Sequence, residues 1–229
     1  MRETDHKGFV LRRQDYGDTS MLVDVFTRTS GRFRLVAKGV RSGKGAKARA
    51  IQPFSDLLLG WSGRSELKTL IQIESVQNYA LDKQAAVCGF YLNELLWNFL
   101  EINDPHQDLF DVYQQSLHQL AEGFDLESTL RVFEFFLLKD IGYEAIFDID
   151  SESGEPLEPS QGYRFELEQG LVKSSGDDAY VGDLFLAIAN NDFSSIPVRK
   201  LAKRLSRQII CHRMEGKELH SRKWFMSNT

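Results

Sequence analysis

The chain has 229 residues, 42% of them hydrophobic, and a formal net charge of -5, which suits one large globular domain or a few small ones. The N-terminal stretch "MRETDHKGFVLRRQ" carries charges throughout, which argues against a signal peptide, and the sequence nowhere approaches the roughly 20 apolar residues of a membrane helix. We therefore expect a cytoplasmic protein with no membrane association.

Residues 1–80 contain five short runs that are rich in β-branched and aromatic residues. The runs cover residues 8–16, 19–27, 32–39, 54–61 and 66–75. In the third run Phe33 and Leu35 alternate with Arg34, as a strand with one buried and one exposed face requires. Five short strands in so short a segment favour a closed barrel, because closure removes the sheet edges. We predict a five-stranded OB-fold.

Residues from 82 onwards show the periodicity of helices. Helices are expected over residues 84–102, 105–120, 126–143, 182–190 and 194–214. Pro105 suits a first helical turn, and Leu201, Leu205 and Ile209 form an apolar row in the last helix. Between them, segment 144–181 is acidic and turn-rich, with two strand-like pieces that indicate a hairpin inside an irregular insertion. The chain is thus predicted to be an α+β protein.

The sequence lacks the spacing of common catalytic and metal-binding motifs. Gly39 and Gly43 stand too close together for a phosphate-binding loop, and no G-x-S-x-G nucleophile motif is present. Cys211 and His212 are neighbours that diverge on a helix, which does not suit a metal site. Cys88 and Cys211 fall in apolar patterns typical of buried thiols, although one bridge between them stays open. We expect no enzyme.

Positive charge is concentrated at both ends of the chain. Residues 1–80 carry 14 Lys and Arg against 8 Asp and Glu, residues 81–198 carry 5 against 23, and residues 199–229 carry 9 against 2. A basic segment is the usual electrostatic footprint of a polyanion partner. The two ends are therefore the places to look for a nucleic-acid interface.

The densest basic stretch runs from residue 28 to residue 49 and contains no acid. Its glycines predict a flexible loop over residues 38–49 whose cations follow a phosphate backbone, and a merely solvated loop is the alternative. Phe33 and Phe54 are expected in the core, whereas Trp61 beside a turn is the candidate for stacking on bases. The candidate nucleic-acid-binding residues are Arg28, Arg32, Arg34, Lys38, Arg41, Lys44, Lys47, Arg49 and Trp61.

A second basic patch lies on the predicted helix over residues 194–214. Most of its cations recur at helical spacing, opposite the apolar row. Three interpretations of these cations are open. They could extend a nucleic-acid path, they could accept an acidic peptide, or they could form only the polar face of an amphipathic helix. The patch consists of Arg199, Lys200, Lys203, Arg204 and Arg207.

Five stretches carry a family resemblance. They are "GFVLRRQDYGDTSMLVDVFTRTSGRFRLVAKGVRSGKG", "QPFSDLLLGWSGRSELKTL", "YLNELLWNFL", "LRVFEFFLLKDIGY" and "GKELHSRKWF". Together they resemble the bacterial RecO family of DNA repair and recombination mediators. The resemblance implies an N-terminal OB-fold, a helical C-terminal domain, binding of single- and double-stranded DNA, and annealing of complementary strands. It also implies a nucleoid-associated protein that works with RecR and the single-strand binding protein SSB to load RecA, without catalytic residues.

The same resemblance leads to expectations about zinc binding and about the residues that contact SSB. Many family members carry a four-cysteine zinc module after the position of Gly142 and Tyr143, but residues 144–181 contain neither cysteine nor histidine. No zinc or other cofactor is therefore expected. Arg131 and Lys139 are, by resemblance, candidates for binding the acidic tail of SSB, in competition with the second basic patch.

We interpret the chain as a non-catalytic DNA-binding and strand-annealing mediator, with an OB-fold over residues 1–80 and a helical domain over residues 81–229. Two other interpretations stay open. One is a protein-interaction adaptor whose contact with DNA is incidental. The other is an RNA-binding OB module, because stacking and phosphate contacts do not read the 2′-hydroxyl unless a site is built for it.

Overall fold

The computed structural model describes residues 2–43 and 45–221, which form two compact units. Unit 1 comprises residues 1–126 and the C-terminal segment that begins at Leu219, and unit 2 comprises residues 127–218. This division differs from the predicted boundary at residue 80. The boundary lies later in the chain because the first two long helices, which follow residue 80, share a hydrophobic core with the barrel.

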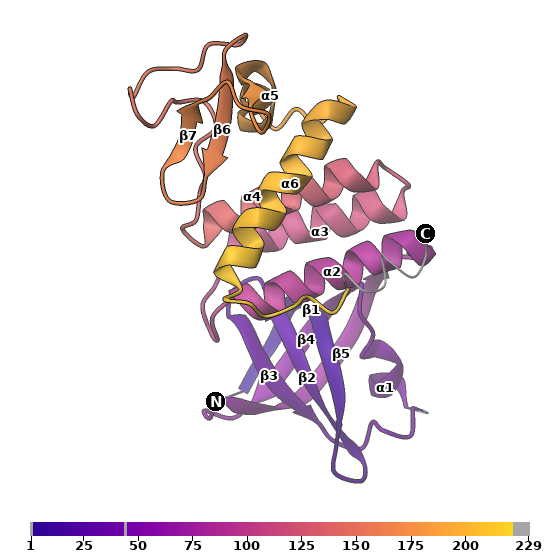
Figure 1. Ribbon diagram of the computed structural model, residues 1–229. Coiled ribbons are helices and arrows are strands. Elements are labelled where there is room, and N and C mark those ends of the chain that lie inside the picture. Colours follow the sequence, from indigo (N-terminus) through magenta and orange to yellow (C-terminus); the bar gives the residue numbers. More distant parts are fainter. Residues whose placement is uncertain (1, 44, 222–229) are drawn as a thin grey trace. The chain divides into compact units, whose positions relative to one another are not determined.

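Five strands of unit 1 form a closed barrel with the order β1-β2-β3-β5-β4 (Figure 1). They are β1 (Arg2–Tyr16), β2 (Ser20–Thr27), β3 (Gly31–Ala37), β4 (Ser55–Ser62) and β5 (Leu67–Asn78). Neighbouring strands are antiparallel except β3 and β5, which pair in parallel. The predicted five-stranded OB-like barrel is confirmed.

The barrel core follows the alternation of its sequence. On β3, Phe33, Leu35 and Ala37 are buried. Gly31, at the start of β3, has a φ of 67°, and a side chain there would collide with the backbone of Asp104. Glycine is therefore required at this position by both conformation and space.

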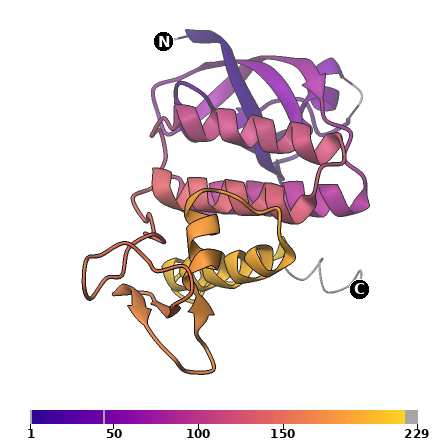
Figure 2. The same ribbon diagram turned by 90° about the horizontal axis from the view of Figure 1, so that it is seen from above.

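Two helices pack against the barrel within unit 1, α2 (Lys83–Phe99) and α3 (Gln107–Ala121), as Figures 1 and 2 show. The ring of Phe9 on β1 lies 5.2 Å from Phe110 and 5.0 Å from Tyr113, both on α3. Asn93 on α2 donates a hydrogen bond to the carbonyl oxygen of Leu11 and accepts one from the hydroxyl of Tyr113. These contacts make the helices part of the barrel unit.

The C-terminal segment returns to α2 through one carboxylate. Glu94 accepts hydrogen bonds from the backbone N–H of His220 at 2.7 Å and of Ser221 at 2.9 Å, and from the Ser221 hydroxyl at 2.6 Å. Leu219 and Ser221 are buried. A single acidic side chain thus anchors the end of the described chain to unit 1.

Unit 2 contains three helices and a small sheet with the strand order β7-β6-β8. They are α4 (Leu126–Asp140), α5 (Gly182–Ala189), α6 (Ile196–Arg213), β6 (Gly162–Glu166), β7 (Gly170–Lys173) and β8 (Tyr180–Val181). Ser195 caps α6 by accepting a hydrogen bond from the N–H of Val198, and Pro197 stands in the first turn. The predicted helices and hairpin are present.

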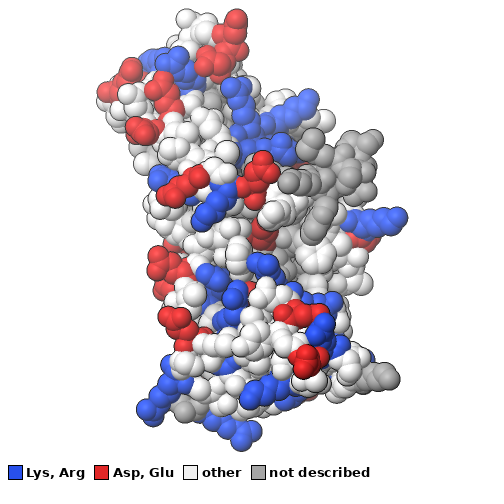
Figure 3. Space-filling model, turned by 60° about the horizontal axis from the view of Figure 1, so that its bottom comes forward, with Lys and Arg blue, Asp and Glu red and all other residues white. Residues whose placement is uncertain are grey.

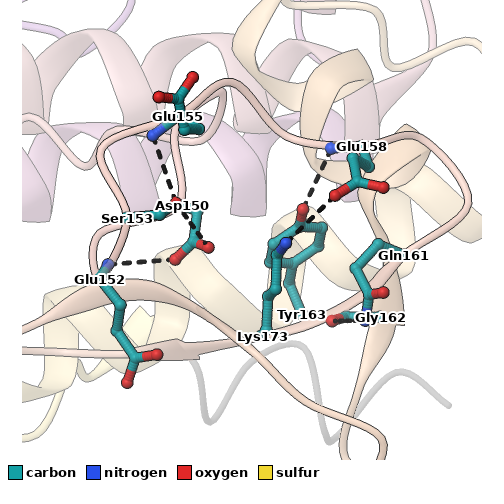
Figure 4. Close-up of polar contacts among 9 residues, drawn as sticks. All are labelled: Asp150, Glu152, Ser153, Glu155, Glu158, Gln161, Gly162, Tyr163 and Lys173. Atoms are coloured by element: carbon teal, nitrogen blue, oxygen red, sulfur yellow. Dashed lines mark hydrogen bonds and ion pairs between the residues drawn. The ribbon is translucent and has the colours of Figure 1, made fainter.

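Segment 144–181 is held together by hydrogen bonds around a buried carboxylate (Figure 4). Asp150 accepts hydrogen bonds from the Glu152 N–H at 3.1 Å and the Ser153 hydroxyl at 3.0 Å. The Tyr163 hydroxyl accepts one from the Glu158 N–H, and Lys173 forms an ion pair with the Glu158 carboxylate at 3.1 Å. Short-range polar contacts and the buried ring of Tyr163 therefore organise the insertion.

Two local predictions need correction. The expected loop over residues 38–49 contains a short helix, α1 (Ala46–Ala50), and its flanks are fixed by the buried side chains of Val40 and Ile51. Neither cysteine forms a disulfide, and Cys88 is buried as expected, whereas Cys211 is exposed on α6. Within the described ranges, none of the helices is long and apolar enough to cross a membrane.

Candidate nucleic-acid interface

Arg28 is engaged inside unit 1. It lies in the β2–β3 turn, and its guanidinium donates two hydrogen bonds of 2.9 Å to the carboxylate of Asp111 on α3. The hydrogen bond and the charge of Asp111 raise the pKa of Arg28, and the same hydrogen bond lowers the pKa of Asp111. The charge of this predicted DNA contact is thus neutralised by a residue 83 positions further along the chain.

The two arginines of β3 have internal partners as well. Arg34 pairs with the buried carboxylate of Asp24 through hydrogen bonds of 2.8 and 3.1 Å. Arg32 donates to the carbonyl oxygen of Leu100 at 3.0 Å, and burial lowers the pKa of Arg32. Their first role is to tie neighbouring elements together.

The connection between α2 and α3 lies along this part of the sheet. Ile102 forms a β-bridge with Arg32, and the N–H of Asn103 donates to the Arg32 carbonyl oxygen at 2.8 Å. The side-chain oxygen of Asn103 accepts from Lys68 at 2.7 Å, and the Lys68 ammonium lies 4.2 Å from the centre of the Phe33 ring. The backbone of the α2–α3 connection is therefore paired with the start of β3 at Arg32.

The cations beyond β3 have a more open setting. Lys38 and Lys47 are exposed, and neither forms an ion pair with another described residue. Arg49, also exposed, lies on α1 with Lys47. Lys44 lies outside the described residues. In Figure 3, which brings the bottom of Figure 1 forward, Lys and Arg side chains gather along the lower edge of the barrel.

Arg41 connects this basic segment to the turn between β1 and β2. Its guanidinium donates to the Gly17 carbonyl oxygen at 2.7 Å and pairs with the Asp15 carboxylate at 3.1 Å. Its backbone N–H donates to the Thr19 carbonyl oxygen at 3.0 Å. The β1–β2 turn and residues 38–43 and 45–50 therefore form one basic end of the barrel, which we call the loop end.

Trp61 is not the stacking aromatic that the sequence suggested. Its side chain is 3% exposed and belongs to the barrel core, with ring centres 4.7 Å from Phe33 and 4.5 Å from His6. The prediction was wrong because proximity to a turn does not decide which face of a strand a side chain takes. Phe33 and Phe54 are buried as expected.

Two exposed residues next to turns were not among the candidates chosen from the sequence. Tyr16, the last residue of β1, is 48% exposed and stands beside the turn glycine Gly17. Arg64 is exposed in the β4–β5 turn, directly after Gly63. The available signal was the same in both cases, a side chain next to a turn glycine in a predicted barrel, where loops commonly contact ligands.

The second basic patch is partly neutralised. Lys203 pairs with Glu127 at 2.5 Å, and Arg199 donates to the carbonyl oxygens of Phe193 and Ser194. Arg204 donates to the Tyr180 hydroxyl and lies over its ring. Three of the five predicted cations remain exposed on α6, namely Lys200, Arg204 and Arg207.

The two predicted tail-binding residues on α4 have different surroundings. Arg131 is 2% exposed and bonds to Glu134 at 2.8 Å and to the Ser206 hydroxyl at 3.1 Å. It is therefore a core residue that an incoming peptide does not reach, and its assignment to the SSB tail was wrong. Lys139 is exposed and pairs with Glu144 at 2.7 Å.

Lys139 borders a hollow of about 340 Å³ in unit 2, which we call the α4–α5 groove. Apolar side chains from both helices dominate its lining, and polar groups stand at its rim. The lining includes Val132, Phe135, Phe136, Phe147 and Ile188.

Among the residues that the structure describes, no three His, Cys, Asp or Glu side chains gather as a metal site. Residues 144–181 contain neither cysteine nor histidine, so a thiolate zinc cage does not fit this insertion.

Comparisons with known proteins agree over the whole length. The family model described as "Recombination protein O N terminal" matches residues 1–79, and "Recombination protein O C terminal" matches residues 81–223. The chain is 41% identical to the DNA repair protein RecO of Methylococcus capsulatus, over 98% of this chain and 93% of that protein. It is 40% identical to the DNA repair protein RecO of Haemophilus influenzae, over 100% and 98%. The DNA repair protein RecO of Nitrosospira multiformis is 37% identical, over 96% and 94%.

Proposed function

Because the chain belongs to the RecO family of DNA repair proteins, we propose that it is a non-catalytic recombination mediator that binds single- and double-stranded DNA and anneals complementary strands. With RecR it helps to load RecA on DNA coated by SSB, and it needs no zinc or other cofactor. The loop end of the barrel is the DNA-binding surface in this proposal.

The observation that carries the DNA-binding surface is the contrast between two sets of cations. Arg28, Arg32 and Arg34 are engaged by groups of unit 1, whereas Lys38 and Lys47 extend from the loop end without an ion pair to a described residue. A cation that is not already neutralised releases more counterions from DNA when it meets a phosphate. The loop end is therefore the better phosphate-binding surface.

Annealing follows from the same electrostatics. Two complementary strands repel each other through their phosphates, and a basic surface that neutralises both lets them approach. The step requires positioned positive charge and no bond cleavage.

The proposal is tested on bare oligonucleotides without partner proteins. Changing Lys38 and Lys47 together to Ala removes two phosphate contacts. The slope of log K against log salt on single strands should then fall in magnitude by about 1.4, from roughly 0.7 per contact. Annealing should slow, and the loss should be nearly uniform across sequences because neither lysine reads a base.

Arg28→Ala is the matched control, since it removes a cation of the same basic stretch that Asp111 already neutralises. It should leave the salt slope almost unchanged. An unaltered slope in the lysine double variant, with folding confirmed by circular dichroism, would move the DNA site away from the loop end. Wild-type protein that neither binds nor anneals bare DNA would favour the interaction adaptor, and equal or tighter binding of RNA would favour the RNA module.

The α4–α5 groove is the proposed site for the SSB tail. An acidic tail that ends in an apolar residue needs a cation beside an apolar pocket, and Lys139 at the rim of this groove meets that requirement. The α6 patch carries exposed cations, but the apolar row of α6 is buried in unit 2. The groove therefore offers both parts of the tail-binding chemistry.

A further inference from the structure

The loop end presents an exposed aromatic ring, that of Tyr16, in register with its cations. Tyr16 pairs with Ser20 of β2, and the next residue of β2, Met21, pairs with Ala37 of β3, directly before Lys38. Tyr16 is 48% exposed, and its side chain makes no ring contact or hydrogen bond with another residue in the ranges 2–43 and 45–221. An aromatic ring left open to solvent beside positive charge is the combination that proteins use to hold single strands, because bases stack on the ring while cations bind the phosphates.

We propose that Tyr16 is a stacking platform for a base of single-stranded nucleic acid, with Lys38 and Lys47 holding the flanking phosphates. The inference deepens the proposed DNA-binding function and rests on it. The stacking role predicted from the sequence for Trp61 thereby passes to Tyr16. Trp61 pairs with Glu3 near the start of β1, whereas Tyr16 is the last residue of that strand.

The backbone under Tyr16 is held firmly, which a stacking platform needs. Tyr16 pairs with Ser20 as the last rung of the β1–β2 ladder. The following residue, Gly17, adopts a φ of 60°, and its carbonyl oxygen accepts a hydrogen bond of 2.7 Å from Arg41. A ring on a fixed support loses little conformational freedom when a base stacks on it.

Two acidic residues, Asp15 and Asp18, lie close to Tyr16 in the sequence, and their charges oppose phosphate binding. Asp15 is paired with Arg41 at 3.1 Å, which offsets part of its charge. Asp18 is exposed in the turn. Stacking does not require a phosphate next to the ring itself, because the backbone of a single strand runs at the edge of its bases. The acids therefore restrict where the phosphates lie and leave the face of the ring available.

The test separates base stacking from phosphate binding by comparing two oligonucleotides of equal length. One is oligothymidylate and the other carries abasic residues in place of the thymidines, so the phosphates are the same. Wild-type protein should bind oligothymidylate at least fivefold more tightly, since stacking one base on an aromatic ring contributes about 1 kcal/mol or more. Tyr16→Ala should lose most of this preference and keep its salt slope, whereas Tyr16→Phe should keep both.

Phe124→Ala serves as the control for losing an exposed ring. Phe124 is 58% exposed in the same unit and lies between the acidic residues Glu122 and Asp125 in sequence, so its loss should leave the base preference intact. A Tyr16→Ala protein that retains the full preference for oligothymidylate overturns the platform, and so does wild-type protein that binds both strands equally. Wild-type protein that binds neither strand overturns the DNA-binding proposal itself.

Discussion

Asp150 shows how a single carboxylate organises the insertion of unit 2. Burial raises the pKa of Asp150, but hydrogen bonds from the Glu152 N–H and the Ser153 hydroxyl, together with the charge of Lys173, lower it by more. The net direction is downward, so the folded protein favours the charged form. The turn 150–153 depends on that charge.

The linkage between protonation of Asp150 and folding determines the sign of the pH dependence of stability. The pKa of Asp150 in the folded protein lies below its unfolded value of about 3.9. The contribution of Asp150 to the stability of the turn is therefore fully present above about pH 3.9 and is lost as the pH falls through the folded pKa. Asp150→Ala should accelerate amide exchange across residues 150–173 at pH 7, with a local loss of about 1–3 kcal/mol.

Acidification below pH 4 should accelerate amide exchange across residues 150–173 in the wild type. It should cause little further acceleration in Asp150→Ala. A chelator should change neither protein, because no thiolate cage is available in the insertion. Fast exchange in the wild type at pH 7, unaffected by the substitution, would show that the Asp150 contacts do not stabilise the segment.

At the level of helices, α4 and α6 carry the two rival candidate surfaces for the proposed binding of the SSB tail, and Glu144 distinguishes between them. It pairs with Lys139 at the rim of the α4–α5 groove and so competes with an acidic peptide. Glu144→Gln should therefore tighten binding of a tail peptide severalfold, and Lys139→Ala should weaken it.

The matched control changes Lys200, Arg204 and Arg207 to Ala, which removes the exposed charge of α6. Tail affinity at physiological salt, measured by fluorescence anisotropy, should change little in this variant, because the groove is untouched. Tight binding by Lys139→Ala together with loss of binding in the α6 variant would place the tail on α6.

The limits of the sequence-based predictions can be traced to particular elements. Alternation on β3 and the apolar row of α6 decide which side chains are buried, and both were predicted correctly from local pattern. The five residues of α1 are too few to show a periodicity. The partner of Arg28 lies on α3, and no local pattern connects the two. The charges of the site were therefore visible in the sequence, whereas their neutralisation was not.

At the scale of the whole molecule, the chain leaves unit 1 after residue 126 and rejoins it at Leu219. The rejoining depends on Glu94, which accepts hydrogen bonds from His220 and Ser221. Glu94→Ala should release this segment and reduce the free energy of unfolding of unit 1 by about 2 kcal/mol, because hydrogen bonds to a charged group are the stronger kind.

Amide exchange at His220 and Ser221 should accelerate, and the emission of Trp97 should shift to longer wavelength, since this ring lines the same hollow as both residues. Glu101→Ala is the control, as an exposed acid of the same unit. If exchange at the two amides stays slow without the Glu94 carboxylate, the burial of Leu219 alone is enough to hold the segment.

The return of the chain to α2 also makes unit 2 an internal cassette, bounded on both sides by residues that belong to the barrel unit. The buried core cluster of the barrel consists of residues of unit 1, such as Val25, Leu35 and Leu57. Residues within the cassette can therefore be exchanged over evolutionary time without repacking the barrel. Loss of the Asp150 carboxylate, for example, should loosen the turn 150–153 and leave the loop end as it is.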